Sequence, residues 1–179
     1  GTRRQVVFTM GKPSVLWAFD RRTGEHLLHR LVVPYQNVYK QIDEKTGAIT
    51  INDDIIPKAV GTFERVCPGM RGGKIFQAKA YNPRTDAVYS AVSLACSNFE
   101  ILSLDKSASG FNWDRMEPMQ GSGGNVGRLV AVRASTGEIL WTHDQRVAIG
   151  SVMTTAGGLV FAGDFERYFR AFDAENGKV

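Results

Sequence analysis

A short phrase occurs three times along the chain, and it constrains the fold more than any other feature. Its copies are AFDRRTGEHLL (Ala18 to Leu28), AVRASTGEILW (Ala131 to Trp141) and AFDAENGKV (Ala171 to Val179). The second and third copies begin 40 residues apart, which is about the length of one four-stranded propeller blade. The repeat therefore predicts a chain built of blades, each of which buries its faces against its neighbours.

Each copy has the pattern of a strand, a tight turn and a second strand. The turn carries a glycine, which suits a left-handed backbone conformation, in all three copies: Gly24, Gly137 and Gly177. Asp20 and Asp173 can accept hydrogen bonds from the backbone of their own turns. Arg133 stands at that position in the middle copy, so we expect its turn to form without a carboxylate.

An indole at the end of the motif offers a large surface for packing on the neighbouring blade. Trp141 supplies it in the middle copy, and Leu28 takes its place in the first. The last copy stops at Val179, before this position. We interpret this as a chain that ends inside a hairpin and forms part of a larger ring.

The remaining sequence favours the same all-β class. Val, Ile, Phe, Tyr and Thr are frequent between turn signals that recur about every 8–12 residues, and no stretch has a sustained helical period. The predicted fold is one partial β-propeller over residues 1–179, with antiparallel four-stranded blades and an irregular excursion at about 35–63. Expected strand-like stretches lie at 4–10, 14–20, 87–94, 127–134, 138–144, 150–164 and 167–173.

Composition excludes some classes of protein. The 179 residues are 43% hydrophobic with a net charge of +4, and the basic residues are scattered, which favours a solvated surface over a nucleic-acid interface. No apolar run approaches the roughly 18 residues of a membrane span, and the first residues do not form a signal peptide. Cys67 and Cys96 have no metal or haem spacing. They are either buried free thiols or a disulfide, which would imply an oxidising compartment.

Several segments resemble the quinoprotein alcohol dehydrogenases, which carry pyrroloquinoline quinone (PQQ) in an eight-bladed propeller. The repeated phrase is similar to that family's tryptophan-docking motif. CPGMRGGKIFQAKAYNPRTDAVY (Cys67 to Tyr89) and ACSNFE (Ala95 to Glu100) resemble a family segment with a cysteine at each end. The stretch from Gly127 to Val179 is similar to the late blades of the branch that oxidises primary alcohols or polyols.

The resemblance implies a function, a compartment and a disulfide. It implies a disulfide between Cys67 and Cys96 and a periplasmic location. It also implies oxidation of an alcohol, polyol or sugar by hydride transfer to PQQ, with Ca²⁺ or a lanthanide polarising the quinone and an aspartate as general base. The implied partners are the remaining blades, the small substrate and a cytochrome c-type electron acceptor, with no nucleic acid and no membrane span.

The family's catalytic aspartate, metal ligands and quinone-contacting basic residue lie upstream of the matched part. We therefore assign no catalytic and no metal-binding residue in this chain, leave its cofactor-binding residues unknown, and expect the segment alone to bind no cofactor and to be inactive. Ile75 and Phe76 stand where the family often has Asn-Trp, and the Ile75 side chain cannot form a hydrogen bond. This departure favours an alternative function, a non-catalytic propeller module for binding or assembly.

Other polar residues are interpreted as structural. His26 and His29 are three apart on a predicted strand, so we expect their side chains on opposite faces. We expect Asp53 and Asp54 in a solvated turn, and Asp164 and Glu166 in a loop. The glycine-rich segment 119–127 is predicted to be a flexible connection, because no helix and no Lys-Ser/Thr follow it.

Overall fold

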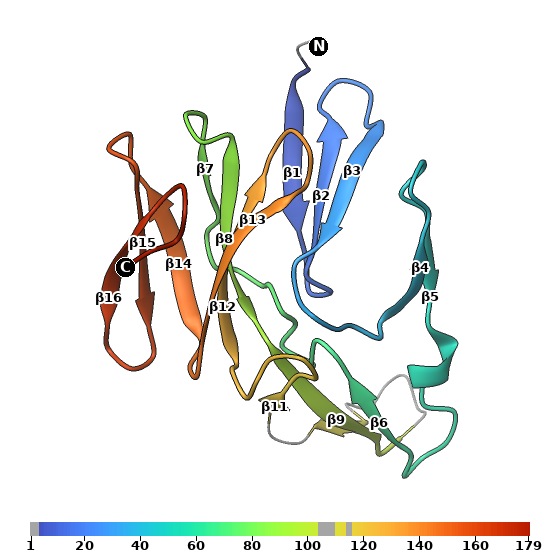
Figure 1. The fold of residues 1–179 in the computed structure, drawn as a ribbon. Coiled ribbons are helices and arrows are strands. Elements are labelled where there is room, and N and C mark those ends of the chain that lie inside the picture. Colours follow the sequence, from blue (N-terminus) through green and yellow to red (C-terminus); the bar gives the residue numbers. More distant parts are fainter. Residues whose placement is uncertain (1–3, 104–109, 114–115) are drawn as a thin grey trace.

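The chain folds almost entirely into antiparallel β-strands (Figure 1). The computed structural model describes residues 4–103, 110–113 and 116–179. Within these residues the one helical element is the short 3₁₀ turn η1 (Asp53–Ile55). The predicted all-β class is confirmed.

Three sheets lie side by side and follow the order of the sequence (Figure 1). The N-terminal sheet contains β1 (Val6–Met10), β2 (Val15–Asp20) and β3 (His26–Leu31). The central sheet contains β7 (Ala80–Asn82), β8 (Ala87–Ser93), β12 (Gly127–Arg133) and β13 (Ile139–Gln145), in the order β13-β12-β8-β7. The C-terminal sheet contains β14 (Ile149–Thr154), β15 (Leu159–Asp164) and β16 (Phe169–Asp173).

Two smaller sheets complete the described chain. β4 (Tyr39–Ile42) and β5 (Ile49–Ile51) form a hairpin between β3 and η1. β9 (Ala95–Ile101) follows β8 after a single residue and pairs with three short strands, β6 (Phe63–Val66), β10 (Phe111–Trp113) and β11 (Glu117–Pro118). This second sheet lies below the central one in Figure 1.

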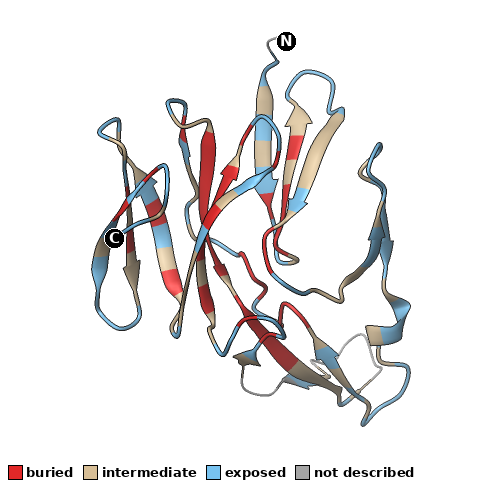
Figure 2. Cartoon of the chain, viewed as in Figure 1, coloured by how far each residue is buried: buried red, intermediate tan, exposed pale blue. Residues whose placement is uncertain are grey.

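The two inner strands of the central sheet, β8 and β12, are buried on both faces, as the red residues of Figure 2 show. Side chains alternate along β8 because successive residues of a strand point to opposite faces. Val88 and Val92 pack in the cluster shared with the N-terminal sheet, whereas Tyr89 and Ala91 pack in the cluster shared with the C-terminal sheet. The sheets therefore pack face to face through two apolar layers, as blades of a propeller do.

Strands are present at the predicted places, except that the stretch 150–164 is divided by a turn into β14 and β15. Within the described residues, the region around 35–63 holds β4, β5, η1 and the start of β6. The central sheet has the four strands expected of a blade. The N-terminal and C-terminal sheets each have three strands within the described residues, which is one fewer than predicted.

The repeated turns have the predicted geometry, with one correction. Gly24, Gly137 and Gly177 have φ values of 75°, 75° and 72°. The turn beside Arg133 does receive a carboxylate, contrary to expectation. Asp86 at the β7–β8 turn accepts hydrogen bonds from the Ser135 backbone N–H and the Ser135 hydroxyl. A neighbouring turn of the same sheet thus supplies the acceptor that this copy lacks.

Candidate functional site

Residues 67–79, here called the crossing loop, run from β6 to β7 and touch all three main sheets. The Gly73 N–H donates to the Lys12 carbonyl in the β1–β2 turn (2.8 Å), and the Ser93 N–H on β8 donates to the Gly73 carbonyl (2.7 Å). Further along, the Ala78 N–H donates to Ser151 Oγ on β14 (3.0 Å). The loop therefore joins one end of the N-terminal, central and C-terminal sheets.

Two glycines allow this close approach. Gly72 has a φ of +76°, and a Cβ atom there would lie 2.8 Å from Lys12 Cα. A Cβ atom on Gly73 would collide with Ser14 Oγ. Any other residue at Gly72 would push the loop away from the β1–β2 turn, since the Lys12 backbone cannot yield as the end of a flexible side chain can, and any other residue at Gly73 would displace the Ser14 side chain.

The predicted disulfide anchors the start of the loop. Cys67 is bonded to Cys96 on β9, and both residues are buried. The Gly69 N–H also donates to the Ala95 carbonyl (2.8 Å). Covalent and hydrogen bonds thus hold the loop on β9 before it crosses to the other sheets.

Lys74 lies inside the protein although it carries a charge. The residue is 1% exposed, and among the described residues Nζ has no hydrogen-bond partner. Burial, and then the positive charge of Lys79, lower the pKa of Lys74 to about 8. Ser14 Oγ, in the β1–β2 turn just before β2, is likewise buried and has no hydrogen-bond partner among the described residues. Because burying an unpaired ammonium is costly, Lys74 is chemically suited to an acidic partner.

The next residues of the loop return to the surface. Ile75 is 44% exposed and Phe76 is 86% exposed. The Ile75 backbone N–H donates to Gln77 Oε1 (3.2 Å), but its side chain offers only apolar surface. The loop therefore combines a buried cation with an exposed apolar pair.

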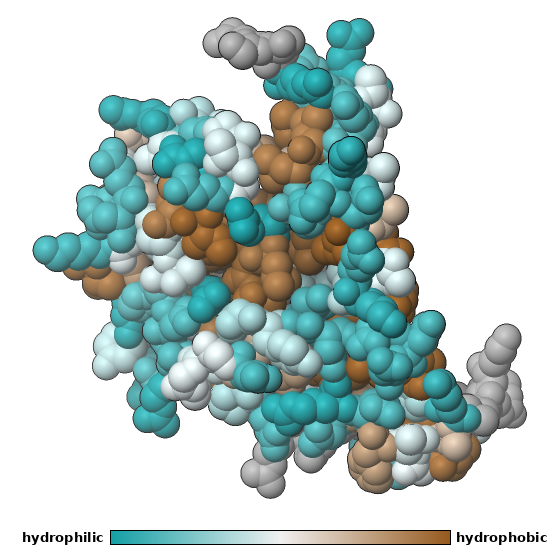
Figure 3. All heavy atoms as spheres, turned by 45° about the vertical axis from the view of Figure 1, so that its right-hand side comes forward, coloured by the Kyte–Doolittle hydropathy of each residue, from teal (hydrophilic) through white to brown (hydrophobic). Residues whose placement is uncertain are grey.

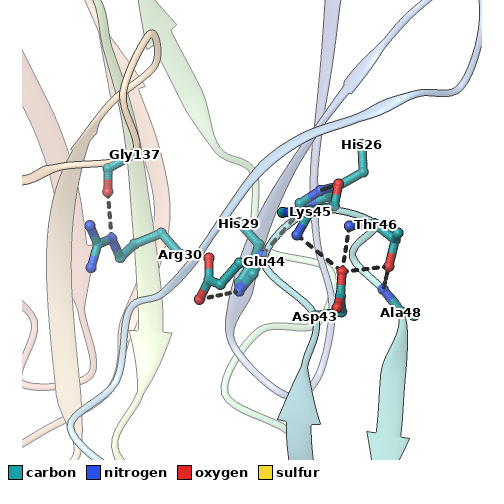
Figure 4. A network of polar contacts seen from close by, with 9 residues as sticks. All are labelled: His26, His29, Arg30, Asp43, Glu44, Lys45, Thr46, Ala48 and Gly137. Atoms are coloured by element: carbon teal, nitrogen blue, oxygen red, sulfur yellow. Dashed lines mark hydrogen bonds and ion pairs between the residues drawn. The ribbon is translucent and has the colours of Figure 1, made fainter.

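The prediction for the two histidines is wrong, because their side chains are on the same face and in contact (Figure 4). His29 Nδ1 lies 3.3 Å from His26 Nε2. The reason is a β-bulge: Phe19 pairs with His26 and Ala18 with Leu28, so that one residue between them is unpaired. An extra residue in one strand reverses the alternation of the side chains that follow it.

The histidine pair packs against the β4–β5 hairpin. His26 Nδ1 lies 3.3 Å from the Lys45 carbonyl, and His29 Nε2 lies 3.6 Å from Glu44 Oε1. Burial is the largest of the effects that lower the pKa of His29 below its ordinary value, and the nearby Glu44 carboxylate opposes it. Within the described part of the chain, no three His, Cys, Asp or Glu residues are arranged to hold a metal ion.

The aspartates singled out in the sequence lie in exposed or turn positions. Asp53 and Asp54 are exposed in η1. Asp164 accepts hydrogen bonds from the backbone N–H groups of Glu166 and Tyr168 and pairs with Arg170. Burial opposes ionisation of Asp164, but these hydrogen bonds and the Arg170 charge keep its pKa below the ordinary value. Asp164 therefore holds the β15–β16 turn.

Sequence reasoning missed Lys74, although a signal was present. The pair of glycines before it indicates a close approach of the backbone at this point. For the histidine contact the sequence carries no signal, because nothing in it marks the bulge beside Leu27.

Comparison with protein families and with curated proteins gives matches of two kinds, an assembly-factor family model and dehydrogenase relatives. A family model described as "Outer membrane protein assembly factor BamB" matches residues 76–179. The putative dehydrogenase XoxF of Paracoccus denitrificans is 26% identical over 191 residues, covering 99% of this chain and 32% of the relative. Lupanine 17-hydroxylase [cytochrome c] of Pseudomonas sp. is 32% identical over 186 residues, covering 99% of this chain and 26% of the relative.

Solved structures match over the whole chain. A europium-containing methanol dehydrogenase superposes with a TM-score of 0.85 and 25% sequence identity, covering 100% of this chain and 32% of that protein. The chain thus spans between about a quarter and a third of the length of these relatives.

Proposed function

The chain belongs to the quinoprotein, PQQ-dependent alcohol dehydrogenase family, and from that premise we propose that it is a segment of an enzyme that oxidises an alcohol, polyol or sugar. The observation that carries the proposal is the match along the whole chain to a methanol dehydrogenase that contains europium. The Cys67–Cys96 disulfide supports it, since the family resemblance implied this pair.

The proposed whole is a closed propeller of which residues 1–179 form several consecutive blades, with an excursion at about 35–63. The share of each relative that the chain covers supports this division. The three-stranded flanking sheets support it too, because a further strand on each would complete a blade of four.

Within that whole, the crossing loop is proposed to form part of the wall of the cofactor site. PQQ would accept the hydride of the alcohol, with Ca²⁺ or a lanthanide polarising its carbonyl. Lys74 fits such a cofactor in charge, because its buried ammonium has no acidic partner among the described residues and PQQ carries carboxylates. The general base and the metal ligands are assigned to residues outside this chain.

The proposed electron acceptor is a cytochrome c, as the name of the lupanine 17-hydroxylase [cytochrome c] indicates for that relative. The proposed compartment is the periplasm. The buried disulfide supports it, because disulfides persist in oxidising compartments. Within the described residues no helix is long and apolar enough to cross a membrane.

The test is reconstitution of the full-length protein. The protein would be incubated with PQQ and either Ca²⁺ or a lanthanide, and dye reduction would be measured with primary alcohols, polyols and sugars. We expect cofactor-dependent turnover of at least one of these classes. A folded full-length protein that binds PQQ with neither metal would contradict the proposal.

A second candidate function is a non-catalytic propeller module for binding or assembly. One observation from the sequence and one from the comparisons favour it. The matching family model is described by an assembly factor, and Ile75 cannot supply a side-chain hydrogen bond to a quinone. A propeller module for binding or assembly would give no PQQ-dependent absorbance change in the reconstitution, whereas the dehydrogenase would.

A further inference from the structure

The junction between the central and C-terminal sheets is closed by two aromatic side chains with hydrogen-bond donors. Trp141 Nε1 donates to the Ala174 carbonyl (3.0 Å), and the Tyr89 hydroxyl donates to the same oxygen (2.9 Å). The indole lies directly on Gly177, where a Cβ atom would be 2.5 Å from Trp141 Cε3. Trp141 is only 8% exposed, so this junction is filled.

The junction between the N-terminal and central sheets has the same plan with different residues. In the repeated phrase Leu28 stands at the position of Trp141, and Gly137 at that of Gly177. Leu28 Cδ1 would lie 3.2 Å from a Cβ atom on Gly137, so the leucine packs on the glycine as the tryptophan does.

The residues that correspond to Tyr89 and Ala174 in the first junction follow from the strand register and from the repeated phrase. Phe8 pairs with Ala18 as Tyr89 pairs with Ala131, and both alanines open their copies of the phrase. Phe8 is therefore the counterpart of Tyr89. The counterpart of Ala174 is Ala134, which follows Arg133 as Ala174 follows Asp173.

The first junction thus lacks an indole and both donors, because neither a leucine nor a phenylalanine side chain can donate a hydrogen bond. A cavity of about 620 Å³ is present there, a volume within the range of small-molecule sites. Its lining comes from both sheets: Arg4, Val6, Phe8, Ala18, Leu27, Leu28, Tyr81, Asp86, Ala134 and Ser135. Figure 3 shows hydrophobic side chains gathered in a hollow that hydrophilic ones border.

The charged groups of this cavity already have partners. Arg4 pairs with Glu25 (2.7 Å), and Asp86 accepts hydrogen bonds from Ser135. The cavity is therefore suited to a neutral, mainly apolar occupant rather than to an ion.

We propose that this cavity binds a neutral, flat aromatic molecule of the indole type, whose N–H donates to the Ala134 carbonyl oxygen. The ring would lie beside Leu28 and Phe8, in the cavity between the two sheets. The site is separate from the crossing loop, and the inference does not depend on the dehydrogenase function.

The experiment is ligand-observed saturation-transfer NMR of the full-length protein with indole as the probe. We expect saturation transfer to indole in the natural protein and none in Leu28→Trp, whose side chain would fill the cavity. Leu159→Trp is the matched control, because Leu159 is 40% exposed on β15, away from the cavity, and it should leave the signal unchanged. Absence of transfer in the natural protein, or equal transfer in Leu28→Trp, would overturn the proposal.

Two further measurements keep the test decisive. If Leu28→Trp does not fold, Leu28→Phe fills part of the cavity and should weaken indole binding. The second probe is 1-methylindole, which keeps the ring but has no donor. Loss of one hydrogen bond should weaken its binding by roughly 3- to 10-fold, and equal binding of the two probes would contradict the role of the Ala134 carbonyl.

Discussion

Lys74 is the residue whose surroundings agree least with its chemistry. A buried ammonium without a partner lowers stability, whereas the two glycines before it and the hydrogen bonds of Gly73 hold the backbone in place. The fold keeps this buried ammonium despite its cost in stability. Such positions are typical of sites where a ligand or another chain segment supplies the opposite charge.

Replacing Lys74 by methionine should raise the unfolding free energy of the cofactor-free protein at pH 7 by about 1–3 kcal/mol. The folded pKa of about 8 is below the ordinary 10.5. The unfolded state therefore binds more protons between these values, and the natural protein gains stability as pH rises from 8 to 10.5. Denaturant unfolding should show that Lys74→Met exceeds the natural protein in unfolding free energy by less at pH 10 than at pH 7.

The same variant separates stability from cofactor binding. If Lys74 meets a carboxylate of PQQ, Lys74→Met should bind PQQ more weakly while being more stable without it. Lys58→Met is the control, because Lys58 is exposed and lies outside the crossing loop, and it should leave both stability and PQQ affinity unchanged. A destabilised Lys74→Met with unchanged PQQ affinity would contradict this role.

His143 and His29 make stability depend on pH in the acidic range. Burial is the largest effect that lowers the pKa of each below the ordinary 6.5. The unfolded state then takes up protons at a higher pH than the folded state, so stability present above pH 6.5 is lost as pH falls below it. His143→Gln should reduce the slope of unfolding free energy against pH between 7 and 5, measured by urea unfolding. An unchanged slope in both His143→Gln and His29→Gln would refute this.

Among the elements, the crossing loop and β9 depend on each other through the disulfide. Cys67 and Cys96 are 29 residues apart, so their bond closes a loop of the chain. The crossing loop, β7 and β8 lie within this closed loop, and β6 ends just before it. The disulfide excludes many extended conformations of the unfolded chain, which raises the free energy of the unfolded state.

Replacing both cysteines by serine should lower the unfolding free energy by about 3–4 kcal/mol, the chain-entropy value for a closed loop of this size. Guanidinium unfolding would measure it. The natural protein with its disulfide reduced serves as the control, and it should match the double variant to within experimental error. A double variant as stable as the oxidised protein would show that packing alone holds the loop on β9.

At the scale of the whole molecule, the C-terminal sheet presents an unusual amount of apolar surface. Phe165 is 79% exposed and Phe169 is 72% exposed, and within the described part of the chain β16 is an edge strand whose one partner is β15. Exposed aromatic side chains beside an unpaired edge favour association.

The 179-residue chain, produced alone, should therefore associate, and it should show no alcohol oxidation when PQQ, metal and dye are added. Sedimentation velocity would detect the association, and Phe165→Ser with Phe169→Ser should reduce it. Clear turnover by a monomer of this chain would show that the general base and metal ligands lie within residues 1–179.

The sequence by itself determined the blade plan. The repeated phrase, its turn glycines and the β-branched and aromatic residues between turn signals are local properties. They depend on the strand preference of these residues and on the conformational freedom of glycine. The disulfide was open from the residues alone, and only the family resemblance singled it out.

The tertiary structure alone decided which side chains meet across sheets. Four features depend on how the sheets and turns pack. They are the bulge that brings His26 and His29 together, the hydrogen bond from Ser135 to the Asp86 carboxylate, the burial of Lys74 and the cavity beside Leu28. Such contacts depend on how packed sheets are placed relative to one another. A one-residue change in register reverses which face a side chain occupies, and no local pattern records it.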